Sequence, residues 1–489
     1  MLENLADGHG LRWNVDERVQ VYTHPLWMLI NACAHLLSGE IFWTVTVLGL
    51  LCSLGAFLAL ARPFAAQPAV VGFAVLLPWL LSASLRRYTT SGFENPLTHL
   101  LLALFVARLL AWRRSEAPPW GALFLLAGLA ATNRLDTVVL FVPALAWLCI
   151  AERARLRIAP ILRGFAPLLA WLAFSVGYYG FFLPNTALAK VSAGVPLSAY
   201  LWHGTLYALD LVQRDPVTVL LLAAGAGVTV HAGLRWRRGS SDLLDAKLAV
   251  LGLGALCYEV YVWRVGGGFL TGRFFTAPAV VAIAGVAARA ESIARWCGAL
   301  SPAGRSGLGV ALLALAPALL LLANGTSQLT AESRLIPLPV ARAEPGRDLR
   351  WQLSNDAEIF HTRGVVAREA ARSGDRVSVQ TAVGFTGLAA GPEAILIDPF
   401  ALTDPLLARL PPVAGDEFLA GHVRRAIPRG YAFARQTGSL ERMEPALREY
   451  YGALRLLTSG DLFTRERWAA IVDFQLGRRS PPGDGSADR

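Results

Sequence analysis

Long apolar runs alternate with short polar loops over the first 325 residues of the chain. A helix needs about 20 mostly apolar residues to cross a bilayer. The pattern predicts about ten crossings, at 41–61, 68–85, 95–112, 119–132, 137–151, 164–183, 217–234, 246–263, 274–290 and 306–323. Residues 25–38 are also apolar but too short to span. With the polar Asn31 and His35, they fit a helix that lies at the membrane surface.

The pattern changes after about residue 325, where charges become frequent and long apolar runs end. Helical periodicity covers 356–373 and 442–457, the first with an apolar side made of Ile359, Val365, Val366 and Ala370. Strand patterns lie at Val377–Thr381 and Ala394–Ile397. We therefore expect three regions: a polytopic α-helical membrane domain at 1–325, a soluble α/β domain at 326–479, and a disordered Pro/Gly/Ser tail at 480–489.

Composition agrees with a membrane protein. Only 16% of the 489 residues are charged, against about 25% in soluble domains. The net charge of +10 fits basic inner loops and anionic lipid headgroups. Because no basic and aromatic residues interleave in the soluble part, we expect no nucleic acid partner. The five cysteines lie in or beside apolar stretches without metal-like spacing, which is typical of small core residues.

The loops on the two sides of the predicted membrane differ in charge. One set holds fourteen basic residues, namely Arg62, Arg113, Arg114, Arg153, Arg155, Arg157, Arg163, Arg235, Arg237, Arg238, Lys247, Arg289, Arg295 and Arg305. The other set holds nine, namely Arg12, Arg18, Arg86, Arg87, Arg134, Lys190, Arg214, Arg264 and Arg273. Because the more basic side faces the cytoplasm, we expect the second set and the C-terminal domain outside a bacterial plasma membrane.

The outward loops also carry unusual polar combinations: Asp16-Glu17-Arg18, Tyr22-Thr23-His24, Ser91-Gly92-Phe93-Glu94-Asn95, Asn133-Arg134-Leu135-Asp136, Pro184-Asn185-Thr186 with Lys190, and Gly266-Gly267-Gly268 with Arg273. Ionisable groups near membrane depth are costly and commonly functional. Arg134 with Asp136 fits either an ion pair that ends two helices or a phosphate-binding cation held by a carboxylate. Glu94 fits either a helix N-terminal charge or an acid of a site. The glycine triplet fits a linker or a flexible loop beside Arg273.

Taken in order, these motifs resemble the GT-C superfamily of polyprenyl-phosphate-sugar-dependent glycosyltransferases. Within it, the chain is most similar to the terminal β-(1→2) arabinofuranosyltransferases and their bacterial relatives. Further residues that carry the resemblance are Gly8–Asn14, Glu17–Trp27, Leu183–Lys190 and Gly272-Arg273-Phe274. In the tail it rests on Val383-Gly384-Phe385, Ile397–Pro405 and Gly421-His422.

The chain departs from this family pattern at two places. Family members begin with a membrane helix and an acidic Asp-Asp-Ala-Tyr-like motif that carries the catalytic carboxylate. Here Glu3–Gly10 resembles the family segment that comes directly after that motif, so the resemblance places the family's base upstream of Met1. Such an upstream helix would also carry the polar Met1–Thr23 across the membrane. The second departure is Gly268, where the family usually has Asp.

The resemblance implies a membrane enzyme that moves a sugar, arabinofuranose in the related family, from a polyprenyl-phosphate donor to an extracytoplasmic glycan or protein. Within this chain the candidate catalytic acids are Glu17 and Glu94. The candidate phosphate ligands are Arg134, Lys190 and Arg273, with Asp136 orienting Arg134. Tyr22, His24 and Asn185 are candidates for sugar hydroxyls, and Arg18 joins this binding set. No cofactor is expected, and the sequence does not decide whether a divalent metal takes part.

Two other functions fit the same residues. A transporter places polar residues near the bilayer midplane, often in inverted repeats; here they gather in the outward loops and no repeat is visible, which favours an enzyme. The second is an inactive relative that binds prenyl lipid without transferring a sugar. It fits a chain in which the family's acidic motif is not seen and Gly268 replaces a further Asp. Two features distinguish this alternative from an active transferase: the acidic family motif expected upstream of Met1, and the residue at position 268.

Overall fold

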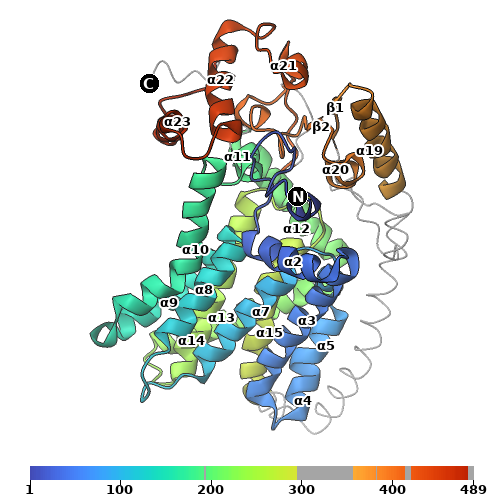
Figure 1. The fold of residues 1–489 in the computed structure, drawn as a ribbon. Helices are drawn as coiled ribbons and strands as arrows, with labels where there is room; N and C mark the ends of the chain where they lie inside the picture. The colour runs from blue at the N-terminus through green and yellow to red at the C-terminus, as the bar shows by residue number, and fades with distance from the viewer. Residues whose placement is uncertain (192–193, 294–355, 382, 414–419, 483–489) are drawn as a thin grey trace.

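The computed structural model describes residues 1–191, 194–293, 356–381, 383–413 and 420–482 of the chain. It is mostly helical. Helices from the first 293 residues form a bundle, and the elements after residue 355 lie at one end of it (Figure 1). The N-terminal segment lies at that same end, between the bundle and the C-terminal part.

Helices occupy nine of the ten stretches in which membrane crossings are predicted, and 306–323 lies outside the described residues. They are α3 (Phe42–Ala61), the run of α4 (Pro68–Val70), η2 (Val71–Leu76) and α5 (Leu77–Leu81), α7 (Asn95–Ala111), α8 (Trp120–Asn133), α9 (Val138–Ala151), α10 (Ile158–Tyr179), α13 (Pro216–Arg237), α14 (Leu243–Arg264) and α15 (Thr276–Ala288). The surface stretch 25–38 forms α2 (Pro25–Ser38).

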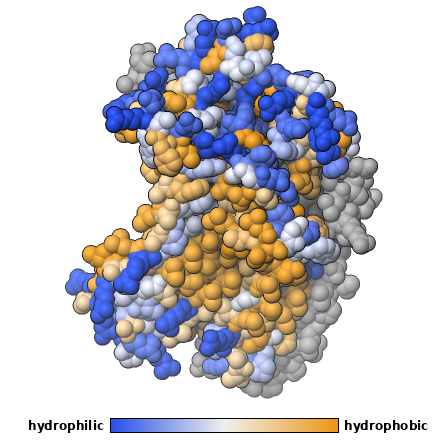
Figure 2. Space-filling view, viewed as in Figure 1, coloured by the Kyte–Doolittle hydropathy of each residue, from blue (hydrophilic) through white to orange (hydrophobic). Residues whose placement is uncertain are grey.

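Length and composition single out fewer of these helices as spans. Among the described residues, three are long and apolar enough to cross a membrane: α3 continued to Phe64, α10 and α13. A fourth is added if Pro68–Leu81 and the adjoining α6 (Ala83–Thr89) form one bent span. The shorter apolar helices α7, α8, α9 and α15 fill the centre of the bundle, and their crossing of the membrane stays a prediction. Apolar side chains cover the visible face of the bundle (Figure 2).

Small residues let the bundle helices approach each other closely. A Cβ atom added at Gly128 of α8 would lie 2.1 Å from the carbonyl oxygen of Gly164 in α10. A Cβ atom at Gly254 of α14 would lie 2.3 Å from the carbonyl oxygen of Leu140 in α9. Such contacts are typical of helix pairs in lipid, where close packing drives association.

The segment predicted as one crossing at 68–85 is bent by 74° after Leu81. Ser82 is extended, and its hydroxyl accepts a hydrogen bond from the Leu85 amide at 3.0 Å. The buried carboxylate of Asp215, at the start of α13, accepts from the Ser84 amide at 2.7 Å and from the Thr218 hydroxyl at 2.6 Å. Because Asp215 satisfies backbone donors that the bend exposes, the chain can turn here. The turn leads α6 towards Glu94.

Replacing Asp215 with alanine is expected to destabilise the bundle by about 1–3 kcal/mol, because buried donors lose their acceptor. Asp242→Ala is the matched control: Asp242 also caps a helix, accepting from the Leu244 amide at 2.9 Å, but its side chain is 45% exposed. Thermal unfolding in detergent should show a clear drop in midpoint for Asp215→Ala and a small one for Asp242→Ala. Equal drops would contradict the role given to Asp215.

The C-terminal part contains the predicted helices and strands. They are α19 (Asp356–Arg372), β1 (Val377–Val379), α20 (Val383–Ala390), β2 (Ile395–Ile397), α21 (Tyr431–Thr437), α22 (Pro445–Ser459) and α23 (Arg465–Gln475). The two strands pair in parallel, with Val377 opposite Ile395. Residues 326–355 and 483–489 of the expected soluble domain and tail lie outside the described residues.

The predicted apolar side of α19 is wrong. Ile359 and Val366 are exposed, and the side that packs on α20 is made of Gly364, Ala367 and Ala371. A Cβ atom at Gly364 would lie 2.4 Å from the carbonyl oxygen of Thr386. The two helices therefore approach so closely that only small side chains fit between them, and the larger ones face outward.

Polar contacts join the C-terminal part to the outer end of the bundle. The Asn14 side chain both donates to and accepts from the backbone of Leu396 in β2, at 3.1 and 3.0 Å. The segment between α10 and α13 contributes α11 (Asn185–Val191) and α12 (Leu197–Arg214). The Asn185 amide donates to the carbonyls of Ala401, Leu402 and Asp404, at 2.9 to 3.2 Å.

Candidate functional site

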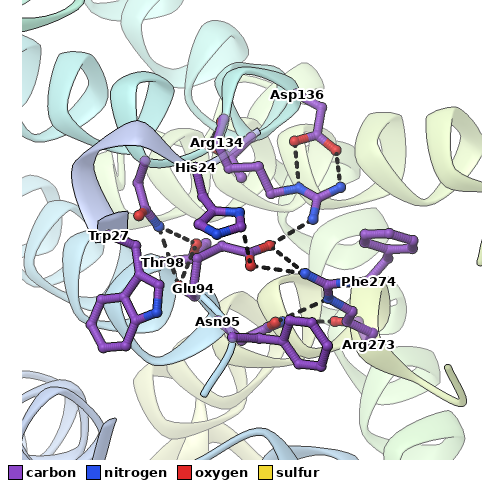
Figure 3. Close-up of polar contacts among 12 residues, drawn as sticks. His24, Trp27, Glu94, Asn95, Thr98, Arg134, Asp136, Arg273 and Phe274 are labelled. Carbon is purple, nitrogen blue, oxygen red and sulfur yellow. Dashed lines mark hydrogen bonds and ion pairs between the residues drawn. The ribbon is translucent and has the colours of Figure 1, made fainter. Parts of the chain in front are cut away.

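Five of the predicted site residues meet at the ends of bundle helices. Glu94 immediately precedes α7, Arg134 follows α8, and Asp136 lies in the short helix η3 (Leu135–Thr137). Arg273 begins η5 (Arg273–Phe275), and His24 precedes α2. Figure 3 shows the side chains of Arg134, Arg273 and His24 around the Glu94 carboxylate, with Asp136 on the other side of the Arg134 guanidinium.

Two guanidinium groups hold the Glu94 carboxylate. Arg134 donates from Nη1 to Glu94 Oε1 at 2.7 Å, and Arg273 donates from Nη2 to both Glu94 oxygens at 2.9 and 2.8 Å. Arg134 also forms a bidentate pair with Asp136, at 2.7 and 3.0 Å. Since Glu94 is only 1% exposed, these charge-assisted bonds lie in a poorly hydrated site, where such bonds are strongest.

Aromatic rings and amides fix the two arginines further. The Arg134 guanidinium lies over the Phe274 ring at 4.4 Å, and that of Arg273 over Phe93 at 3.9 Å. These are cation–π contacts. Asn133 donates to the Glu94 carbonyl and to the Thr98 hydroxyl, at 3.2 and 2.9 Å. The arginine planes are therefore set before any ligand binds.

The charge state of Glu94 depends on these contacts. Burial raises its pKa, but the Arg273 and Arg134 charges outweigh that effect and hold the pKa well below the usual range of a glutamate. Glu94 therefore stays ionised at all physiological pH values. A carboxylate this weakly basic is poorly suited to take a proton from a hydroxyl. The contacts of Glu94 instead suit a group that positions two arginines.

His24 lies at the edge of this cluster. Its Nδ1 is 3.8 Å from Glu94 Oε2, which is too long for a hydrogen bond. Burial lowers the pKa of His24 below 6.5, although the Glu94 charge opposes the shift. His24 is therefore mostly neutral at pH 7, and it offers a ring nitrogen for hydrogen bonding rather than a positive charge.

Lys190 brings a third cation near the arginine pair. Solvent reaches its side chain, which lies against Gly421 of the C-terminal part. Although part of the side chain is exposed, the protein groups around the ammonium exclude water from it; this desolvation, followed by the charges of Arg134 and Arg273, lowers the pKa of Lys190 to about 8. Among the described residues, none forms an ion pair or hydrogen bond with its ammonium group. With Glu94 and Asp136 as the two anions, the three cations leave one positive charge uncompensated.

The other predicted site residues make their contacts away from the Glu94 carboxylate. The Tyr22 hydroxyl pairs with that of Tyr179 at 2.9 Å, and Arg18 donates to the carbonyl of Gly460. Asn185 is occupied by three carbonyls of the C-terminal part. Arg18 and Asn185 thus join their loops to the C-terminal part, whereas Tyr22 packs against α10, and no described contact joins the three to Glu94 or Arg273.

Glu17 belongs to a separate buried network. Its Oε1 lies 2.6 Å from Nη1 of Arg435 in α21 and accepts from the Asn14 amide at 3.1 Å. Arg435 also donates to Asp16 at 3.0 and 3.1 Å. Burial raises the pKa of Glu17 to about 7, with Arg435 opposing the shift. The sequence thus pointed to two carboxylates, and the structure places them in different networks.

Sequence reasoning missed several residues that shape the cluster. Asn133 and Phe274 are direct neighbours of Arg134 and Arg273, so the motifs contained them without showing their roles. Asn95 donates to the Thr276 hydroxyl at 3.1 Å and to the Arg273 carbonyl at 3.0 Å. Gly268, where the related family has Asp, lies beside this cluster: a Cβ atom there would be 2.8 Å from the Phe274 ring.

His422, from the C-terminal part of the chain, lies near Lys190. Its ring packs edge-on against Phe269 and Phe400, with centroids 4.7 and 5.5 Å apart. Burial and the nearby Lys190 charge lower the pKa of His422 to about 4, so the ring is neutral. No group of three or more His, Cys, Asp or Glu side chains with metal-binding geometry occurs in the described ranges.

Comparison with known proteins points to one kind of enzyme. The chain is 28% identical over 307 residues to a terminal β-(1→2)-arabinofuranosyltransferase of Mycobacterium tuberculosis, covering 57% of this chain and 49% of the relative. It is 26% identical over 313 residues to the Corynebacterium glutamicum protein of the same name, covering 57% and 44%. The aligned region thus spans about half the length of these curated relatives. No protein-family model and no solved structure matches the chain.

Proposed function

We propose that this protein is a membrane glycosyltransferase that takes its sugar from a polyprenyl-phosphate donor. The observation that carries the proposal is the uncompensated positive charge formed by Arg134, Arg273 and Lys190 at the ends of bundle helices. The names of the two relatives support transfer of a sugar, arabinofuranose in their case. The acceptor in this proposal is a glycan or protein outside the plasma membrane of a bacterium.

In this proposal the three cations bind the donor phosphate. Arg273 uses only Nη2 and Nε in its described hydrogen bonds, so Nη1 is available to a phosphate oxygen. Lys190 adds a point charge from the C-terminal side of the cluster. When the bond from the sugar to the phosphate breaks, negative charge grows on the phosphate. Preorganised cations stabilise that charge more in the transition state than in the bound donor, which is how they accelerate the reaction.

The membrane helices fit the other half of the donor. A polyprenyl chain is apolar, so its transfer into water is unfavourable, and it remains in the bilayer while its phosphate reaches the surface. The helix ends that carry Glu94, Arg134 and Arg273 border an apolar bundle with exposed leucines and phenylalanines. The charge difference between the two sets of loops supports placing this end outside the cytoplasm.

One observation favours a second function, binding of the lipid-linked sugar without transfer. Both oxygens of Glu94 are held by arginines, and Glu17 lies buried in the separate network of Arg435, so neither candidate acid offers a carboxylate oxygen to an acceptor hydroxyl beside the three cations. The described residues therefore account for the phosphate side of the reaction, whereas the base is left unassigned.

A transfer assay separates the two functions. The full chain in lipid nanodiscs is given radiolabelled polyprenyl-phosphate arabinofuranose and an arabinan oligosaccharide, with polyprenyl-phosphate mannose as the matched donor. Label in the oligosaccharide from the arabinose donor supports the transferase. Donor binding without label in the oligosaccharide supports the lipid-binding function. Absence of both binding and transfer would overturn the proposal.

Donor affinity is expected to depend on the protonation of Lys190. The ammonium form binds phosphate, and its pKa of about 8 means that the charge is lost as the pH rises through that value. Binding of polyprenyl monophosphate should therefore weaken between pH 7 and pH 9, and Lys190→Met should weaken it at pH 7 and flatten the dependence. Lys190→Arg, which keeps its charge throughout this range, should bind with little change. An unchanged alkaline weakening in Lys190→Met would remove Lys190 from the site.

A further inference from the structure

Helix α23 leaves an apolar stripe facing outward on the C-terminal part. Trp468, Val472 and Leu476 follow one another at four-residue spacing, so they lie on one helix face. They are 41, 47 and 60% exposed, and Phe463 before the helix is 90% exposed. An adjacent face is buried, with Arg467 and Ile471 at 0 and 2% exposure. An exposed cluster of this kind is typical of a surface that meets a partner.

Direct contacts fasten α23 to the end of a predicted membrane span. Arg467 donates to the carbonyls of Gly177 and Tyr178, at 2.8 and 3.0 Å, in the last turn of α10. The Gln475 amide donates to the Gly180 carbonyl at 3.0 Å. α10 is one of the three helices long and apolar enough to cross a membrane among the described residues. Therefore α23 lies at one end of that candidate span.

The apolar surface continues from α10 to α23. Phe182 and Leu183, just after α10, are 51 and 52% exposed, and the Phe181 ring packs edge-on against Phe474 of α23 at 6.0 Å. Figure 2 shows apolar surface rising from the bundle to the base of the C-terminal part on this side. Three arginines and two acidic residues lie between 465 and 479, besides the buried Arg467, which gives this segment a net positive charge.

We propose that α23 is a membrane-surface helix, with Trp468, Val472 and Leu476 inserted among the lipids of the bilayer that α10 crosses. An amphipathic helix with tryptophan on its apolar side and arginines at its ends is suited to the boundary between headgroups and acyl chains. Arg465, Arg478 and Arg479 are placed to meet anionic headgroups. Arg478 and Arg479 also form exposed ion pairs, with Asp473 at 3.3 Å and with Glu449 at 3.0 Å, which headgroup phosphates would compete with. The helix thereby fixes the height of the C-terminal part above the membrane. This inference does not depend on the proposed enzymatic function.

Photo-crosslinking tests this contact in the full chain. p-Benzoylphenylalanine is placed at Trp468 and, as the matched control, at Val366, which is 61% exposed on α19 of the same part. The protein is illuminated in nanodiscs of phosphatidylglycerol and phosphatidylcholine, and adducts are identified by mass. The probe at 468 should capture lipid, and the probe at 366 should not. A probe at Val472 repeats the test with Trp468 intact, in case the substitution at 468 perturbs folding.

Other adducts decide against the proposal. Crosslinking of position 468 to a second copy of the chain would assign the stripe to a protein interface. Equal lipid capture at positions 468 and 366, or none at 468 and 472, would also overturn it. If the arginines meet headgroups, Arg478→Gln combined with Arg479→Gln should reduce capture in phosphatidylglycerol and leave it unchanged in phosphatidylcholine alone.

Discussion

Arg134→Ala is expected to destabilise the folded protein by about 3–5 kcal/mol, because it breaks a buried charge network: Asp136 loses the arginine with which it pairs, and Glu94 keeps only Arg273. Arg134 is bound to both Glu94 and Asp136, and Glu94 is 1% exposed. The same substitution should abolish binding of polyprenyl monophosphate. Thermal unfolding in detergent and lipid binding in nanodiscs measure the two effects on one protein preparation.

Two further variants make this result interpretable. Arg86→Ala removes an exposed arginine of the neighbouring α6 and should leave both stability and binding unchanged. Arg134→Lys restores a charge without the planar fork that pairs with Asp136, so it should recover stability only in part. If Arg134→Ala unfolds at the wild-type temperature and binds the lipid normally, the cluster around Glu94 has neither of the assigned roles.

Arg435→Ala is expected to have a similarly large effect on stability, about 3–5 kcal/mol, for the same reason. Arg435 is buried and pairs with both Glu17 and Asp16, so its loss removes both ion pairs between the N-terminal segment and α21 and leaves the buried Glu17 without its cation. Arg429→Ala, an exposed arginine just before α21, is the control. The midpoint of thermal unfolding should fall for Arg435→Ala alone.

Glu17→Gln separates a structural from a catalytic role for Glu17. Burial raises the pKa of Glu17 from its usual value to about 7, so the ionised form is disfavoured in the folded state. The contribution of this group to stability is full below the unfolded pKa and is lost as the pH rises through about 7. Glutamine does not ionise, so the variant should lose this part of the pH dependence and keep the wild-type rate of sugar transfer. A large loss of transfer in a stable Glu17→Gln protein would make Glu17 a catalytic candidate again.

The helical bundle could largely be predicted from hydropathy because lipid imposes one requirement on every span. Uninterrupted apolar residues such as Phe42–Ala61 leave few alternatives to a helix. The bend after Leu81 could not be predicted in this way, since it depends on Asp215, a residue more than a hundred positions away. The packed side of α19 was mispredicted because Gly364 and Ala367 carry little hydrophobic signal, although they allow the closest approach.

The candidate site could be predicted only in part. Glu94, Arg134, Asp136 and Arg273 were selected because charged residues beside apolar spans are unusual, and the structure brings these four together. The same criterion selected Glu17, Arg18 and Asn185, which contact the C-terminal part instead. Residue type and loop position cannot distinguish these cases, because the partners, such as Arg435 and the Ala401 carbonyl, lie hundreds of residues away.

The central claim, that the cations around Glu94 bind the phosphate of a polyprenyl lipid, is tested most directly by equilibrium binding to the full chain in nanodiscs. Polyprenyl monophosphate is compared with the uncharged polyprenol of the same length, at low and high salt. We expect the monophosphate to bind much more tightly, with the difference lost in Lys190→Met and reduced by salt. Equal binding of the two lipids, or a difference of wild-type size in Lys190→Met, would contradict the account.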